Sequence, residues 1–150
     1  MMRSFFIFLL VILGTFIIDQ NIKSVFLDGY YYAGKCIDLE LHFNQGVAFS
    51  MFAFLGDYLK WIQALLIVGI LYVVIKEKYL RHYAFPLGLL VGGALGNVYD
   101  RFVHGGVVDY VAWHCGFKFA VFNYADVAID LAVVWIVIQH YFFSDGVKTK

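Results

Sequence analysis

The sequence predicts a helical membrane protein with four transmembrane helices, a small extracytoplasmic β-sheet, and an interfacial loop or helix that covers a polar site. Of the 150 residues, 63% are hydrophobic and 20% are aromatic, whereas a soluble domain is nearer ~45–50% apolar. Four apolar stretches are each long enough to cross a bilayer. We therefore expect a single integral membrane domain over residues 1–150. The formal net charge of zero argues against nucleic acid as a partner.

The first apolar stretch predicts a helix over residues 4–27. It follows Arg3 and resembles a signal peptide, but no small-residue cleavage site follows it, so we expect an uncleaved span. Its far end turns polar. Asp19 and Lys23 lie four residues apart with the acid first, which is the favourable order for pairing on a helix. The pair could position the helix end at the membrane interface or form a polar wall of the site, and both readings stay open.

The segment over residues 28–57 has a different character. Tyr30, Tyr31 and Tyr32 form an aromatic cluster of the kind found at membrane interfaces. Residues 37–43 alternate between apolar and polar with period two, which predicts a short strand with one wet face. A turn signal at residues 44–46 follows. We expect a small sheet on the membrane surface here.

Three further apolar stretches predict helices over residues 59–75, 83–99 and 124–143. The third helix carries Gly88, Gly92 and Gly96 at four-residue spacing. This spacing puts the glycines on one face and favours close helix packing. The segment over residues 100–122, between the third and fourth helices, is expected outside the membrane core.

Basic residues predict the orientation. Four spans put both termini on one side, together with the basic loop over residues 76–81. Short loops and termini rich in lysine and arginine are usually cytoplasmic. We therefore expect both termini in the cytoplasm and the segments 28–57 and 100–122 at the outer face.

Polar groups gather between Gly92 and Asp130 in otherwise apolar surroundings, and ionisable groups at membrane depth are candidate functional residues. Asn123 is a plausible N-cap of the fourth helix, and Asp126 lies in its first turn, where the helix dipole stabilises a carboxylate. Asp109 lies on a segment that could approach this helix. Two converging carboxyls would share a proton, as in an aspartic protease, where one activates water and the other polarises the peptide carbonyl.

Other polar residues in this region have less certain roles. Asp100 and Arg101 end the third helix and could form an ion pair or bind substrate, and Asn97 lies one turn before Arg101. Asp130 lies one turn beyond Asp126. A small proton-coupled transporter is the alternative function, although such proteins usually keep their acids near the bilayer midplane.

Cysteines and histidines give weaker signals. Cys36 and Cys115 are too few for a disulfide framework. They could pair in an oxidising compartment, but we favour small buried hydrophobic residues. No Cys/His cluster has zinc spacing, so no metal and no cofactor are expected. His104 lies near the carboxylates in sequence, and we favour a structural role for it.

Five short motifs occur in order along nearly the whole chain. They are Asp19-x-x-x-Lys23, Phe43-Asn44-x-Gly46-x-Ala48-Phe49-Ser50, Gly92-Gly93-Ala94-x-Gly96-Asn97-x-x-Asp100-Arg101, Val107-Val108-Asp109-Tyr110 and Phe122-Asn123-x-Ala125-Asp126. Together they resemble bacterial lipoprotein signal peptidase (signal peptidase II). Each motif is weak by itself, but five in the same order are highly specific.

The resemblance implies a membrane aspartic endopeptidase of the bacterial inner membrane, without a metal and with its active site near the outer face. Its substrates would be diacylglyceryl-prolipoproteins, cleaved just before the lipidated cysteine. Membrane lipids and a globomycin-type inhibitor would be further partners. Asp109 and Asp126 would form the catalytic dyad. The supporting residues would be Asp19, Lys23, Asn44, Gly46, Asn97, Asp100, Arg101 and Asn123. Asp130 departs from the family pattern, in which a small or weakly polar residue is more usual.

Overall fold

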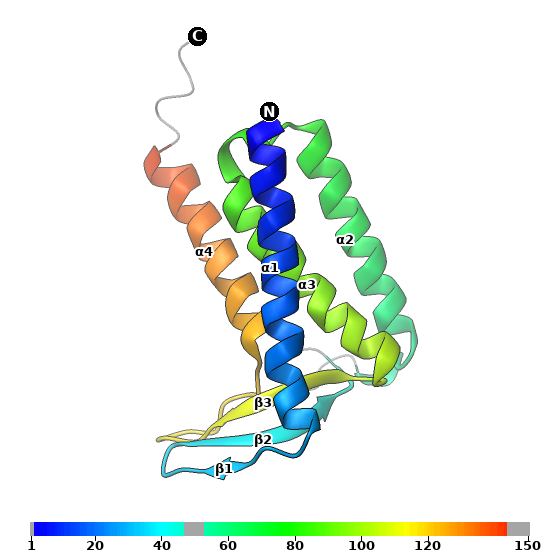
Figure 1. The fold of residues 1–150 in the computed structure, drawn as a ribbon, viewed down its shortest axis with the longest axis vertical. Coiled ribbons are helices and arrows are strands. Elements are labelled where there is room, and N and C mark those ends of the chain that lie inside the picture. The colour runs from blue at the N-terminus through cyan, green and yellow to red at the C-terminus, as the bar shows by residue number, and fades with distance from the viewer. Residues whose placement is uncertain (1, 47–52, 144–150) are drawn as a thin grey trace.

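The computed structural model describes residues 2–46 and 53–143, which form four long helices and a small sheet at one end of them (Figure 1). The helices are α1 (Met2–Leu27), α2 (Tyr58–Lys76), α3 (Leu80–Val103) and α4 (Tyr124–Phe143). The strands are β1 (Tyr32–Ala33), β2 (Ile37–Asn44) and β3 (Val107–Trp113), and a short 3-10 helix, η2 (Ala53–Leu55), precedes α2. The part of the second motif from Ala48 to Ser50 lies outside the described residues.

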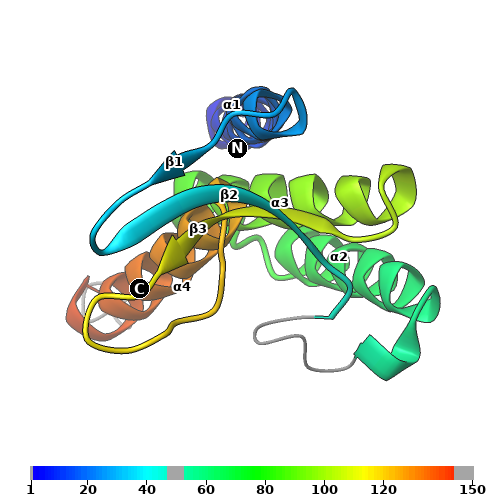
Figure 2. The same ribbon diagram turned by 90° about the horizontal axis from the view of Figure 1, so that it is seen from below.

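Helix α3 is the central helix of the bundle. Seen from below, α1 lies on one side of it and α2 and α4 lie on the other (Figure 2). Among the described residues, α1, α2 and α4 are long and apolar enough to cross a membrane. Helix α3 is also long, with 24 residues, but it holds several glycines and the polar residues Asn97, Asp100 and Arg101. It continues to Val103, beyond the predicted end at residue 99.

The expected close packing through glycines is present between α3 and α1. A Cβ atom at Gly88 would lie 2.7 Å from Cβ of Val11, and one at Gly92 would lie 2.8 Å from Cβ of Thr15. A Cβ atom at Gly96 would collide with the carboxylate of Asp19. The glycines therefore let the backbones approach closely, and they bring α1 and its polar end against α3.

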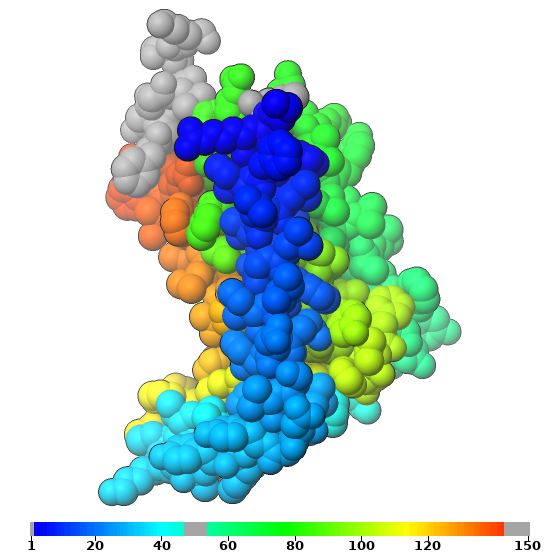
Figure 3. All heavy atoms as spheres, in the orientation of Figure 1, coloured from blue at the N-terminus to red at the C-terminus, as the bar shows by residue number. Residues whose placement is uncertain are grey.

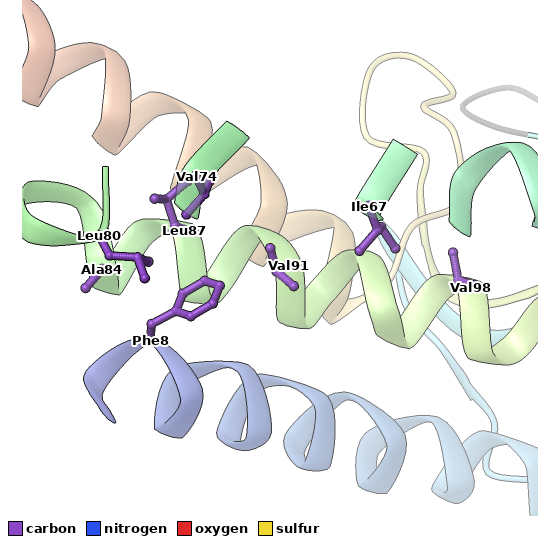
Figure 4. Close-up of a cluster of buried hydrophobic side chains, with 8 residues drawn as sticks. All are labelled: Phe8, Ile67, Val74, Leu80, Ala84, Leu87, Val91 and Val98. Atoms are coloured by element: carbon purple, nitrogen blue, oxygen red, sulfur yellow. The ribbon is translucent and has the colours of Figure 1, made fainter. Parts of the chain in front are cut away.

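Apolar side chains between α1, α2 and α3 form the hydrophobic core (Figure 4). The buried members are Phe8, Ile67, Val74, Leu80, Ala84, Leu87, Val91 and Val98. Many other apolar side chains point outwards, and Leu10, Leu65 and Leu131 are each more than half exposed. In water such a surface would be unfavourable, so these side chains fit a hydrocarbon environment.

The sheet is antiparallel, with the strand order β1-β2-β3. Its outer end projects sideways beyond the helices (Figure 3). The small sheet was predicted, but the segment that became β3 was expected to be a loop or helix. This expectation was wrong. Val107, Val108, Asp109 and Tyr110 are all buried, so the sequence of this strand lacks the alternation of apolar and polar residues that marks a half-exposed strand.

The regular alternation expected for β2 is also interrupted. Leu39 pairs with Val111 and His42 pairs with Asp109, so the register shifts between them. The strand therefore carries an extra residue, which is the property of a β-bulge. Beyond the bulge, Asn44 comes within reach of Asp109.

The two cysteines form a disulfide between Cys36, just before β2, and Cys115, just after β3. The interpretation of both as unpaired buried residues was therefore wrong. They lie 79 residues apart in sequence, but the pairing of Ile37 with Trp113 brings them together. The disulfide links the outer ends of the two long strands.

Candidate active site

Asp109 and Asp126 come from different elements and meet at Asn123. Asp109 lies on β3 and is buried, and Asp126 lies in the first turn of α4. The side-chain amide of Asn123 donates to Oδ1 of Asp109 at 2.7 Å. Its Oδ1 accepts from the backbone N–H of Asp126 at 2.9 Å, and its own N–H donates to Oδ2 of Asp126 at 3.1 Å. Asn123 is thus the predicted N-cap of α4, and it also connects the two acids.

Two further asparagines complete the surroundings of these carboxyls. Asn44 donates its Nδ2 to the second oxygen of Asp109 at 3.0 Å. Asn97 donates its Nδ2 to Oδ1 of Asp126 at 2.8 Å. Each carboxyl oxygen of both acids therefore accepts a hydrogen bond from an N–H group, which fixes the orientation of both carboxyls.

The electrostatics of Asp109 are unusual. Burial, followed by the nearby charge of Asp126, raises the pKa of Asp109 to about 6. The amides of Asn44 and Asn123 oppose this shift because they donate to the ionised form. Two carboxyls in this environment can hold a shared proton near neutral pH. Such a pair can activate a water molecule and polarise a carbonyl group in one step.

Lys23 is the centre of a buried charge network next to the two acids. Its Nζ lies 2.7 Å from Oδ2 of Asp19 and 2.7 Å from Oδ2 of Asp100. It also donates to Oδ1 of Asn97 at 3.0 Å. Buried charges need partners of this kind, because an unpaired one is costly. The predicted pair of Asp19 and Lys23 therefore exists, and it is buried within the bundle.

Gln20 was not predicted from the sequence. Its Nε2 donates to Asp19 and to Asp100, at 3.0 Å in both cases. It therefore links the carboxylates of Asp19 and Asp100, which lie 81 positions apart in the chain. The only feature of the sequence that could have indicated this role is that Gln20 lies next to Asp19, and a glutamine beside an acid is too common to predict a contact.

Arg101 fixes the end of β2 to α3. Its Nη1 donates to the backbone carbonyl of Asn44 at 3.3 Å, and its Nη2 donates to the carbonyl of Gly46. The N–H of Gly46 in turn donates to Oδ1 of Asn44 at 3.0 Å. The guanidinium thus holds the segment that supplies Asn44 to Asp109, and no ion pair joins Arg101 to its neighbour Asp100 among the described residues.

The turn from α3 to β3 is also fixed by a side chain. Oδ2 of Asp100 accepts from the backbone N–H of Val108 at 3.1 Å, directly before Asp109. Gly105 has a φ of +75°, which favours glycine. A Cβ atom at Gly106 would lie 3.2 Å from the carbonyl oxygen of Asn44. These contacts set the position at which β3 begins.

Tyr110 also connects the elements of the site. It belongs to the fourth sequence motif, but no role was predicted for it. Its hydroxyl accepts from the backbone N–H of Tyr124 at 2.9 Å, and its ring stacks on Phe26 with centroids 4.2 Å apart. Burial raises the pKa of Tyr110 to about 12, so it stays neutral. His104 is exposed at the end of α3 and takes no part in these hydrogen bonds.

Comparison with known proteins gives consistent results. The family model described as Signal peptidase (SPase) II matches residues 11–142. The lipoprotein signal peptidase of Sulfurovum sp. (strain NBC37-1) is 77% identical over 142 residues, which cover 95% of this chain and 97% of the relative. That of Sulfurimonas denitrificans is 59% identical, covering 93% of this chain and 90% of the relative.

The fold has solved counterparts. One solved structure, described as a bacterial membrane enzyme, has a TM-score of 0.80 at 24% identity and covers 95% of this chain and 92% of its own. A second with the same description has a TM-score of 0.76 at 25% identity, with coverage of 91% and 93%. With its apolar helices, the chain is a multi-pass membrane protein. The motifs, the fold and the relatives together place this chain in the signal peptidase II family.

Proposed function

We propose that the chain is a membrane aspartic endopeptidase that removes the signal peptide from diacylglyceryl-prolipoproteins, cleaving just before the lipidated cysteine. Membership in the signal peptidase II family supports the cleavage of prolipoproteins. The observation that carries the catalytic type is the convergence of Asp109 and Asp126 on Asn123. Asp109 belongs to a buried strand and Asp126 belongs to the N-terminus of a helix, so both acids are held rigidly.

The surroundings of the two acids suggest which one holds the shared proton. In the free enzyme Asp109 is the protonated partner below about pH 6, because its pKa is raised to about 6. Asp126 is the ionised partner. The N-terminus of α4 and the backbone N–H of Asn123 both favour a carboxylate there. Lys23 adds to this through Asn97, whose oxygen it contacts and whose amide reaches Asp126.

The reaction follows from these roles. Asp126 takes a proton from a water molecule as the water oxygen attacks the carbonyl carbon of the scissile peptide bond. Asp109 gives its proton to the carbonyl oxygen, and a neutral gem-diol results. Asp126 then donates the acquired proton to the leaving nitrogen, the C–N bond breaks, and Asp109 regains a proton from the diol. The products are a carboxylic acid and the free amine of the lipidated cysteine.

The location of the site fits a substrate that stays in the bilayer. The acids of the site lie near the C-terminal end of α3 (Asp100), on β3 (Asp109) and in the first turn of α4 (Asp126), and these elements meet at the end of the bundle that carries the sheet (Figure 1). The disulfide between Cys36 and Cys115 supports an oxidising compartment on that side, which is the outer face of a bacterial cytoplasmic membrane. Both termini then face the cytoplasm, in agreement with the basic residues there.

Lipid anchoring brings the scissile bond to the right depth. A diacylglyceryl group keeps its acyl chains in the hydrocarbon, so the attached cysteine lies near the membrane surface. We therefore propose that the diacylglyceryl group is required and that a globomycin-type cyclic peptide occupies the same site. A proton-coupled transporter has no support in this arrangement, because Asp100, Asp109 and Asp126 gather at one end of the helices.

Cleavage of a synthetic lipobox peptide tests this function. Purified protein in detergent should cleave the diacylglyceryl peptide before its modified cysteine, and it should turn over the unmodified peptide at least about tenfold more slowly. Globomycin should abolish turnover. Equal turnover of both peptides would contradict the lipid requirement. Proton-driven solute uptake in vesicles, without any peptidase activity, would contradict the proposed function as a whole.

A further inference from the structure

Asp130 is a carboxylic acid on α4 for which the described residues supply no partner. It lies one turn beyond Asp126 and is exposed. None of the described residues forms a hydrogen bond or an ion pair with it. Helix α4 is one of the helices long and apolar enough to cross a membrane. A carboxyl on such a helix is costly unless something pairs with it, and a substrate bound along α4 could supply that partner.

One side of α4 packs on α3, and another borders a hollow that α1 also lines. Ala125, Ala128 and Ala132 are buried where α4 packs on α3. Trp135 and Ile138 line a hollow together with Ser4 and Ile7 of α1, so they mark the side that faces α1.

Helical spacing puts Asp130 on a third side of α4, which it shares with Asp126. Val133 and Val137 continue this side towards the other end of the helix, and each is 46–48% exposed. A substrate that extends from the acids into the membrane would follow this side.

A substrate bound at the two acids has backbone N–H groups that lack hydrogen-bond acceptors. Its scissile carbonyl must be free of helical hydrogen bonds before water can attack it, so the backbone there is unwound. Unwound backbone leaves N–H groups without acceptors, and in hydrocarbon each unpaired N–H group is costly. Asp126 and Asp130 are about 6 Å apart along the helix axis. An extended chain rises ~3.3 Å per residue, so this distance corresponds to about two substrate residues.

We propose that Asp130 accepts a hydrogen bond from the unwound substrate backbone, at an amide N–H about two residues before the scissile bond. It acts as a positioning residue that aligns the signal-peptide side of the substrate along α4. This role rests on the proposed function, since it assumes cleavage at Asp109 and Asp126. It also accounts for an acid on a side of α4 that continues with the apolar Val133 and Val137.

Backbone esters test the contact directly. Three diacylglyceryl peptides would each carry an ester in place of one amide, so that the N–H of the first, second or third residue before the scissile bond is removed. Each would be compared with the all-amide peptide, using the wild-type enzyme, Asp130→Leu and Asp130→Asn. Successive N–H groups of an extended chain point to opposite sides, so the esters at neighbouring positions serve as internal controls.

With the wild-type enzyme, we expect one of the three esters to lower kcat/KM by about tenfold or more, as for loss of a hydrogen bond to a charged group. Asp130→Leu should lower kcat/KM for the all-amide peptide by a similar factor, and the ester should then cost nothing further. Asp130→Asn keeps an acceptor oxygen, so it should keep part of the ester effect.

Three results would overturn the proposal. The ester effects could be equal in wild type and Asp130→Leu, Asp130→Leu could cleave the all-amide peptide at the wild-type rate, or both variants could only shift the pH profile. The last result would show that Asp130 acts only by changing the protonation of Asp126 through its charge. Absence of cleavage by the wild-type enzyme would instead contradict the proposed function, so the two failures are distinguishable.

Discussion

The side-chain amide of Asn123 lies 2.7 Å from Oδ1 of Asp109, although the two residues belong to different elements. The same asparagine caps α4 and bonds both the N–H and the carboxyl of Asp126. One residue therefore sets the spacing of the two acids and begins the helix that carries one of them. The strand and the helix must therefore be placed together for the two acids to meet.

Replacing this asparagine should damage catalysis more than stability. Asn123→Ala removes the donor to Asp109 and the cap of α4, and we expect kcat to fall by about 10- to 100-fold, because hydrogen bonds to charged groups contribute about 1.5–3 kcal/mol. Asn21→Ala is the matched control, since Asn21 is exposed on α1 and its side chain bonds only the carbonyl of Ile17 among the described residues. Its cleavage rate should equal the wild-type rate. Equal rates for both variants would contradict the bridging role.

The pH profile should report the proton on Asp109. Because the pKa of Asp109 is raised to about 6, its protonated form is complete below that pH and is lost as the pH rises through it. We expect kcat/KM for the diacylglyceryl peptide to fall with rising pH, with one apparent pKa near 6. The fall in kcat should come at a higher pH, because bound substrate excludes water and so raises the pKa of Asp109 further. A flat kcat/KM between about pH 5 and 8, with the protein folded throughout, would contradict the assignment.

Close packing at Gly96 should be essential for the buried charge network. Gly96→Ala places a methyl group against the carboxylate of Asp19, and overpacking of this kind costs about 1–3 kcal/mol. We expect a lower unfolding temperature in detergent. Gly14→Ala on α1 meets nothing within 4 Å, so it should leave the unfolding temperature unchanged or slightly higher. Equal behaviour of the two variants would show that α1 and α3 do not pack as described.

The disulfide should stabilise the sheet. Replacing Cys36 and Cys115 by serine removes a cross-link between residues 79 apart, and such links typically contribute about 2–4 kcal/mol. We expect a lower unfolding temperature for the double variant and no further decrease on adding reductant. The wild-type protein should shift towards the variant when it is reduced. A reductant effect of equal size in both proteins would show that the shift has another origin.

Much of the fold could be predicted because long apolar stretches and helix caps are local signals. Asn123 and the first turn of α4 were recognised in this way. The strand β3 was missed because its buried residues lack alternation and its partner β2 lies more than 60 residues earlier in the chain. The cysteine pair was missed for the same reason, since only the pairing of β2 with β3 brings Cys36 to Cys115.

The candidate site could be predicted as a set of residues but not as a network. The sequence motifs contain Lys23 and Asn97, yet no spacing indicates that Lys23 contacts Asn97 or that Asn97 contacts Asp126. Gln20 and Tyr110 contribute through contacts with other elements, which only the packed structure defines. Gln20 lies inside the spacing of the first motif without being part of it, and Tyr110 ends the fourth motif without a predicted role.

The most direct test replaces each proposed catalytic acid in turn. Purified Asp109→Asn and Asp126→Asn would be assayed on the diacylglyceryl lipobox peptide beside Asp28→Asn, which changes an exposed acid after the end of α1. Folding of each variant would be checked by its unfolding temperature. We expect Asp28→Asn to cleave at the wild-type rate and both dyad variants to lose at least about 10³-fold in kcat. Near-normal cleavage by either folded dyad variant would contradict the assignment of Asp109 and Asp126 as the catalytic pair.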